Sequence, residues 1–301
     1  MNLPEYRPVV FLGYGYRASG RYEREGIPWE VPILTSWRGM DLVPDNFPYY
    51  FGRPGSISSK YANLIVQNAT HLLVIGARLD YPTTGYMPER FGNNAKRVES
   101  LPNIDCREWI IQCGEWKQQY PLPETWVDKI SLYAREGDIL VPSSSGMASE
   151  MFAQCFKVKK NQRVIFAPGL GAMGFALPMA VGCAMAEPTR RVICIEGDGS
   201  LQVNVQALQT ISQHNLNIKI FVLSNFGYAS IRNTQKARCE GRMIGCDPNS
   251  GLTFPRTQHL AWTYGVDIEE INISPDTVIR PRLTSRMEGT KIIPGRLEDI
   301  E

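Results

Sequence analysis

The sequence lacks any hydrophobic run long enough to cross a membrane. Its longest apolar stretch, residues 174–186, is well short of the roughly 20 residues that a membrane helix needs. The opening residues, MNLPEYRPVV, also lack the basic start and apolar core of a secretory signal peptide. We therefore expect no membrane as a partner and no export, and we expect the chain to work in the cytoplasm.

An excess of charge of either sign is also missing. The 32 Lys and Arg residues are offset by 30 Asp and Glu residues, which leaves a formal net charge of +2. Acidic and basic residues are interleaved along the chain, so no extended patch of one sign is expected. The sequence therefore predicts no nucleic acid as a partner, and a small molecule is the expected ligand.

Histidine is scarce, and the cysteines do not follow a zinc-binding pattern. There are 3 histidines and 7 cysteines, and no two cysteines have the Cys-x-x-Cys spacing. Cys106 with Cys113, and Cys239 with Cys246, are too widely spaced for a zinc site and have no histidine pair to support them. Reduced, mostly buried thiols are the simplest interpretation, which again indicates the cytoplasm.

Short apolar segments alternate with helix-like stretches along the chain. This alternation predicts an α/β fold with two doubly wound parallel-sheet domains. A polar stretch with two prolines at 116–124 predicts a linker, which divides the chain into domains at 1–115 and 125–301. The predicted strands are 9–12, 33–35, 72–75, 139–141, 164–166, 192–195 and 218–223.

A glycine-rich turn, 196–200 (EGDGS), follows one of these strands and precedes a predicted helix at 202–213. Free N–H groups at the start of a helix bind phosphate oxygens, and glycines allow the phosphate to approach closely. Asp198 would repel a bare phosphate. The turn therefore makes chemical sense if a divalent metal ion bridges the carboxylate and the phosphate.

A second turn, 224–227 (SNFG), follows the predicted strand 218–223. Neighbouring parallel strands would bring both turns to the edge where α/β sheets bind ligands. Magnesium prefers oxygen ligands, which the Asp198 carboxylate, the Asn225 side-chain carbonyl and the Gly227 backbone carbonyl would supply. Gly-Asp-Gly alone is also an ordinary β-turn, but an asparagine 27 positions after the aspartate (225 − 198) makes the pattern specific.

The two turns resemble the signature of the thiamine diphosphate-dependent decarboxylases and carboligases, Gly-Asp-Gly followed by an asparagine pair. Ser224 replaces the first asparagine, and Asn225 keeps the second. Within that superfamily the sequence is most similar to acetolactate synthase large subunits, which implies a middle domain followed by a thiamine diphosphate-binding domain. The similar segments are 33–39 (ILTSWRG), 76–80 (GARLD), 168–178 (PGLGAMGFALP), 282–286 (RLTSR) and 297–300 (LEDI).

The resemblance implies roles for individual residues. The Met173 side chain would enforce the bent shape of the cofactor, and the Gly171 carbonyl would accept a hydrogen bond from its aminopyrimidine. Alternatively, Met173 is simply the start of an apolar core helix at 174–186. The predicted cofactor-binding residues are Gly197, Asp198, Gly199, Ser200, Asn225 and Gly227. Ser144 and Ser145, in the turn after the predicted strand 139–141, are further candidates for contact with the diphosphate, and a solvated turn is the alternative.

The function implied is that of a thiamine diphosphate- and magnesium-dependent decarboxylase or carboligase acting on a 2-oxo acid. The family's N-terminal pyrimidine-binding domain, with its proton-relay glutamate, has no match in these 301 residues. Activity is therefore expected to need such a domain, and a non-catalytic cofactor-binding or partner subunit is the alternative. The strand with acidic residues that the resemblance leads us to expect after 95–97 (AKR) is also missing from the pattern.

Two further expectations concern cofactors and partners. Arg78 and Asp80 match positions of the domain that holds FAD in acetolactate synthases, although a surface Arg–Asp pair explains them equally well. A nucleotide-binding domain is a weaker alternative, because the sequence lacks a P-loop lysine and Ala18 replaces the third glycine after Gly13 and Gly15. The apolar helix at 174–186 predicts an exposed interface and a homo-oligomer.

Overall fold

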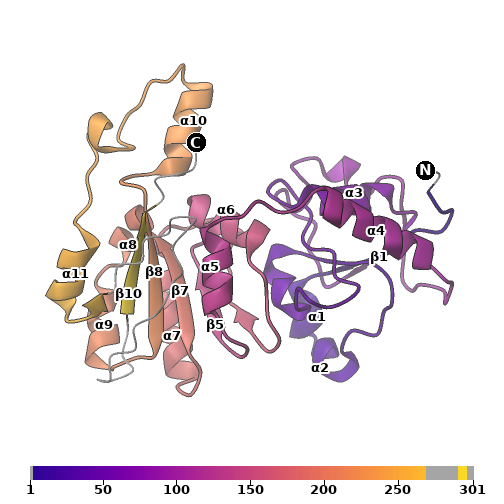
Figure 1. Ribbon diagram of the computed structural model, residues 1–301, viewed down its shortest axis with the longest axis horizontal. Helices are drawn as coiled ribbons and strands as arrows, with labels where there is room; N and C mark the ends of the chain where they lie inside the picture. The colour runs from indigo at the N-terminus through magenta and orange to yellow at the C-terminus, as the bar shows by residue number, and fades with distance from the viewer. Residues whose placement is uncertain (1–2, 269–290, 297–301) are drawn as a thin grey trace. The chain divides into compact units, whose positions relative to one another are not determined.

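A computed structural model describes residues 3–268 and, by its backbone, 291–296 (Figure 1). The chain divides into two compact units, Met1–Ser131 with Ala153–Asn161, and Leu132–Phe152 with Gln162–Glu301. The predicted linker at 116–124 lies inside the first unit. The similar segments at 282–286 and 297–300 lie outside the described residues. Within the described ranges, no helix combines the length and apolar character of a membrane span.

The first unit contains a four-stranded sheet whose paired strands are all parallel, in the order β2-β1-β3-β4. Side chains that alternate along β1 enter two different cores: Val9 and Phe11 join one cluster, while Val10 and Leu12 join the other. Both faces of the sheet are therefore covered, as in a doubly wound fold. The strands are β1 (Pro8–Leu12), β2 (Ile33–Thr35), β3 (His71–Ile75) and β4 (Lys96–Val98), and the helical segments are α1 (Tyr14–Ala18), α2 (Arg21–Glu25), η1 (Trp37–Leu42), α3 (Lys60–Asn68), η2 (Pro88–Arg90) and α4 (Arg107–Gln119).

The start of the predicted linker in this unit is wrong. The predicted linker starts at Trp116, but α4 continues to Gln119 because Trp116 packs edge-on to the buried Trp109, with ring centroids 5.5 Å apart. A short strand, β4, includes Lys96 and Arg97 and pairs with β3, and it contains none of the acidic residues that the resemblance leads us to expect after Arg97. Its sequence, Lys-Arg-Val, shows no apolar alternation because two of the three residues are exposed.

The second unit contains a six-stranded sheet with parallel pairing throughout, in the order β6-β5-β7-β8-β10-β9. Val192 and Cys194 of β7 face the main core, and the alternating Ile193 and Ile195 are buried as well. The strands are β5 (Ile139–Pro142), β6 (Arg163–Val164), β7 (Val192–Gly197), β8 (Ile218–Ser224), β9 (Asp267–Ile268) and β10 (Lys291–Arg296), and the helical segments are α7 (Ala176–Ala186), α8 (Asp198–Val203), α9 (Ala207–Gln213), α10 (Ala229–Arg238), η3 (Pro248–Ser250) and α11 (Thr257–Tyr264); the divisions between the units fall within α5 (Trp126–Tyr133) and α6 (Gly146–Cys155).

Helix α7 owes its apolar composition to the core of its own unit. Leu177, Ala180 and Ala184 are buried in that core, and Met179 and Val181 are partly buried against it. Met185 is the large apolar side chain of the helix that stays exposed, at 55%. The expectation that the apolar face of this helix is exposed as an interface is therefore wrong, because the sheet and α9 already cover it.

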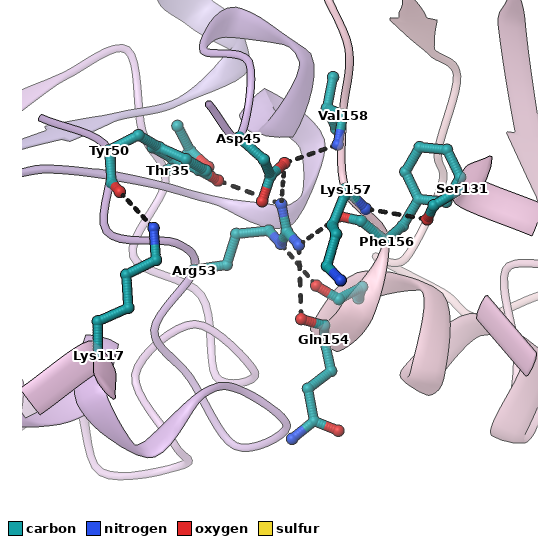
Figure 2. Close-up of polar contacts among 11 residues, drawn as sticks. Thr35, Asp45, Tyr50, Arg53, Lys117, Ser131, Gln154, Phe156, Lys157 and Val158 are labelled. Atoms are coloured by element: carbon teal, nitrogen blue, oxygen red, sulfur yellow. Dashed lines mark hydrogen bonds and ion pairs between the residues drawn. The ribbon is translucent and has the colours of Figure 1, made fainter. Parts of the chain in front are cut away.

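An ion pair between the buried Arg53 and Asp45, whose side chain is 24% exposed, fastens the segment Ala153–Asn161 into the first unit (Figure 2). Arg53, with a side chain that is 3% exposed, donates to the backbone carbonyls of Ala153 at 2.7 Å, Phe156 at 2.8 Å and Gln154 at 3.4 Å. One of its terminal nitrogens lies 3.8 Å from the Asp45 carboxylate. The same carboxylate oxygen accepts the N–H of Val158 at 2.6 Å. Arg53 thus binds carbonyl groups of this segment, while Asp45 binds one of its N–H groups.

Candidate functional site

The two predicted turns lie side by side at the carboxyl edge of the second sheet. Strands β7 and β8 are parallel neighbours, with Gly197 opposite Leu223. Asp198 follows β7 directly, and its Oδ2 atom accepts hydrogen bonds from the second turn: the Ser224 hydroxyl at 3.2 Å, the Asn225 N–H at 3.1 Å and the Phe226 N–H at 2.8 Å. The parallel-strand argument is confirmed, and one carboxylate organises both turns.

The Asp198 carboxylate is buried without a cation among its described contacts. It is 6% exposed, and its Oδ1 atom accepts the N–H of Gly199 at 2.8 Å. Burial raises the pKa of Asp198, while the hydrogen bonds from Gly199, Asn225, Phe226 and Ser224 act in the opposite direction. A buried carboxylate that contacts only neutral donors is suited to receive a metal ion.

The donor set around Asp198 fits magnesium better than a transition metal. Within residues 3–268, no group of three His, Cys, Asp or Glu side chains could hold a metal ion by itself. Magnesium needs few protein ligands, because it keeps water and takes oxygens from a bound phosphate. One carboxylate beside amide oxygens is therefore an adequate protein contribution for magnesium bound together with a diphosphate.

Asn225 lies at the site, and an arginine that the sequence analysis did not identify holds it. Arg232 donates to the Asn225 backbone carbonyl at 3.2 Å, to its side-chain Oδ1 at 3.5 Å and to the carbonyl of Cys246 at 3.4 Å. An amide oxygen has two lone pairs, so Oδ1 retains one for a metal ion. Gly227 is packed so tightly that a Cβ atom there would lie 2.1 Å from the Cys246 carbonyl oxygen. The metal-binding roles of Asn225 and Gly227 stay predictions.

Gly199 is required by an aromatic pair that the sequence did not reveal. A Cβ atom at this position would lie 2.4 Å from the Tyr228 ring and 3.0 Å from the Phe254 ring. The two rings meet edge to face with centroids 5.4 Å apart. This glycine allows the segment that carries Tyr228 and Phe254 to pack against the turn, and its contact with a phosphate stays a prediction.

Met173 lies on a loop before α7 and is not a core residue. The helix begins at Ala176, and the Met173 side chain is 38% exposed. Gly171, in the same loop, has a left-handed backbone with φ of +62°. The exposed position of Met173 contradicts the interpretation that it belongs to an apolar core helix. It leaves the side chain accessible to a ligand, and the cofactor-bending role stays a prediction.

The serines predicted to contact the diphosphate have other partners in the structure. The buried Ser144 hydroxyl donates to the carbonyl oxygen of Ala172, and the Ser200 hydroxyl accepts the N–H of Gly174 at 2.7 Å. The Ser145 carbonyl lies 3.4 Å from the Ser143 hydroxyl. Cofactor contacts by Ser144, Ser145 and Ser200, and by the backbone of Gly197, stay predictions.

The residues that suggested a nucleotide or flavin site in the first unit have structural partners. The N–H groups of Gly13 and Gly15 donate to the carbonyls of Ile75 and Gly76, both at 2.9 Å. The Asp80 carboxylate accepts the N–H of Thr83 at 3.0 Å, while Arg78 is exposed. These contacts explain the residues as parts of turns, so FAD stays a prediction.

Two family models match the sequence. One, described as the C-terminal TPP binding domain of thiamine pyrophosphate enzymes, matches residues 144–290, and the other, their central domain, matches residues 5–105. Among curated relatives, the acetolactate synthase large subunit of Cyanidium caldarium is 28% identical over 99% of this chain and 57% of its own length. The isozyme 1 large subunit of Escherichia coli K12 is 24% identical over 98% of this chain and 59% of its own length. The chain thus spans a little more than half of these relatives.

Proposed function

Because this chain belongs to the thiamine pyrophosphate enzyme family, we propose that its second unit binds thiamine diphosphate through a magnesium ion. The observation that carries the proposal is the buried Asp198 carboxylate, which is bonded to the turn that contains Asn225. Asp198, Asn225 and the Gly227 carbonyl would hold the metal ion. The N–H groups of the 197–200 turn would meet the diphosphate.

We propose a decarboxylase or carboligase activity on a 2-oxo acid, as in the acetolactate synthases that the chain resembles. When bound, the cofactor supplies the electron sink that such a reaction needs. The chain itself orients the cofactor, with the Gly171 carbonyl as a hydrogen-bond acceptor and Met173 as the apolar support beneath the bend. The alternative is a cofactor-binding or partner subunit without catalytic activity of its own.

The remaining active-site groups are expected from a pyrimidine-binding domain. Exposed apolar side chains flank the proposed site in the second unit, which supports contact with a further domain or subunit here. These side chains are Leu170 (99% exposed), Met173 (38%), Val203 (52%) and Phe226 (54%).

All seven cysteines are free thiols, which supports a reducing compartment such as the cytoplasm. The proposal includes a homo-oligomer and, in the first unit, a flavin.

Calorimetric titration of the 301-residue protein tests the proposed binding. We expect thiamine diphosphate to bind in the presence of Mg²⁺ and to release no binding heat in the presence of EDTA, because the Asp198 carboxylate would otherwise repel the diphosphate. Thiamine without phosphates is the control and should bind weakly under both conditions. Equal affinity for thiamine diphosphate with and without Mg²⁺ would refute the metal-bridged site.

A turnover assay separates the catalytic proposal from the alternative. We expect the 301-residue chain, supplied with Mg²⁺, thiamine diphosphate and pyruvate, to release no CO₂ above background. Glu196 is the glutamate beside the predicted turn, and it is fully buried with its carboxylate bonded to the Ala176 N–H at 3.2 Å. It is therefore not placed as an exposed proton relay. Turnover that appears on adding a pyrimidine-binding domain supports the enzyme, and turnover by the chain alone contradicts the expected requirement.

A further inference from the structure

The backbone of the loop 171–176 is held by side chains from other segments. The N–H of Gly174 donates to the Ser200 hydroxyl at 2.7 Å, and its carbonyl accepts from the Asn204 side-chain amide at 2.8 Å. The Ser144 hydroxyl donates to the carbonyl oxygen of Ala172. The residues on both sides of Met173 are thus bonded through their backbone, although Met173 itself contributes no side chain to the core.

Glu196, in strand β7, adds a fourth hydrogen bond to the loop. It is 0% exposed at the end of β7, and its Oε2 atom accepts the N–H of Ala176 at 3.2 Å. The four residues that precede it in the strand are Val192, Ile193, Cys194 and Ile195, so a carboxyl group here is exceptional. Burial of a carboxyl group is costly unless it is hydrogen-bonded. Its other oxygen, Oε1, is buried without a hydrogen-bond partner among the described residues, so the bond to Ala176 is the geometric contact on which its role depends.

The path of the loop leaves little freedom at Gly174. Its φ of +76° is left-handed, and a Cβ atom there would lie 2.7 Å from the Cβ of Val203 in α8. The loop is therefore packed closely against the helix that begins at Asp198. Hydrogen bonds at Ala172, Gly174 and Ala176 then determine where Met173 projects.

We propose that Glu196 is a positioning residue which, together with Ser200 and Asn204, fixes the loop 171–176 relative to the Asp198 turn. The role rests on the proposed cofactor binding, because the fixed loop carries both the Gly171 carbonyl and Met173. Glu196 is not a ligand of the metal ion in this arrangement. It links the segment that orients the thiamine rings to the segment that binds the diphosphate.

Amide hydrogen exchange in the cofactor-free protein tests the attachment directly. In Glu196→Met the acceptor is lost at similar side-chain volume, so we expect the Ala176 N–H to exchange about tenfold faster or more. In Glu196→Gln an acceptor oxygen remains, so exchange should stay close to that of the wild-type protein. Unchanged exchange at Ala176 in Glu196→Met would overturn the proposal. If Glu196→Met does not fold, Asn204→Ala and Ser200→Ala make the same test at Gly174, where unchanged exchange in both would overturn it.

A double-variant cycle tests whether Glu196 acts through the loop. With a pyrimidine-binding domain supplied, hydrogen–deuterium exchange at the thiazolium C2 of bound cofactor should be slower in Glu196→Met and in Met173→Ala. Exchange at C2 in the double variant should be no slower than in Met173→Ala alone, because Glu196 is proposed to act only by positioning Met173 and its loop. Additive losses would overturn the positioning role. If the Ala176 N–H exchanges faster in Glu196→Met but the wild-type protein binds no thiamine diphosphate, the proposed function is refuted. The inference that Glu196 holds the loop then still stands.

Discussion

Replacing Asp198 with alanine is expected to reduce the affinity for thiamine diphosphate in the presence of Mg²⁺ by about 100-fold or more, since changes in outer-shell partners alone typically cost 10–100-fold in metal affinity. The variant loses the one carboxylate proposed to hold the metal ion. It also loses the acceptor of the N–H groups of Asn225 and Phe226, so the second turn loses its tie to the first. Calorimetry at fixed Mg²⁺ concentration measures the effect.

Two further variants separate loss of the metal ligand from loss of fold. Asp198→Asn preserves the shape of the side chain but removes the charge, and it should still weaken binding strongly. Asp267→Ala removes an exposed aspartate from the same unit and should leave the affinity unchanged. Thermal unfolding shows whether each variant is folded. Wild-type affinity in a folded Asp198→Ala protein would exclude this carboxylate as the metal ligand.

Replacing Arg53 with methionine is expected to lower the free energy of unfolding by about 3 kcal/mol, the lower end of the cost of removing one partner of a buried ion pair, because the Asp45 side chain is 24% exposed. The change removes the guanidinium group that lies 3.8 Å from the Asp45 carboxylate. It also leaves the carbonyls of Ala153 and Phe156 without their donor. Urea denaturation followed by circular dichroism measures the loss, which should fall on the transition of the first unit if the two units unfold separately.

An exposed ion pair in the same unit provides the matched control. Arg107 and Asp105 lie 2.5 Å apart, closer than Arg53 and Asp45, but their side chains are 85% and 57% exposed. Arg107→Met should therefore cost no more than about 1 kcal/mol. In the double variant Arg53→Met/Asp45→Leu the unpaired charge is gone, so its loss should be smaller than the sum of the single losses. Equal effects of Arg53→Met and Arg107→Met would show that burial of the pair does not matter.

The sequence predicts those parts of the fold where local pattern and packing agree. Strands such as β2 and β8 are apolar runs between polar turns, and both faces of each sheet are buried, so continuous β-prone segments are a reliable sign. The neighbouring positions of Asp198 and Asn225 follow from the same argument. Once β7 and β8 are adjacent and parallel, their turns have to meet.

The parts that could not be predicted depend on contacts between distant residues. The predicted helix at 202–213 is two helices, α8 and α9, interrupted at Asn204, whose side chain bonds the loop at Gly174. The carbonyl groups that accept hydrogen bonds from Arg53 lie about a hundred positions further along the chain, and no local sequence pattern predicts these contacts. Glu196 did carry a signal, because it is the one charged residue in the apolar strand β7.

The hydrogen bonds of Asp198 have a consequence for how the proposed magnesium ion would bind. Oδ2 accepts three hydrogen bonds from the second turn, whereas Oδ1 accepts one, from Gly199. These bonds hold the second turn in place without any contribution from an ion, so binding of the proposed ion would not have to order it. Oδ1 is the oxygen with room for the ion, so loading should be a capture step whose speed is limited by dehydration of the magnesium rather than by rearrangement of the chain.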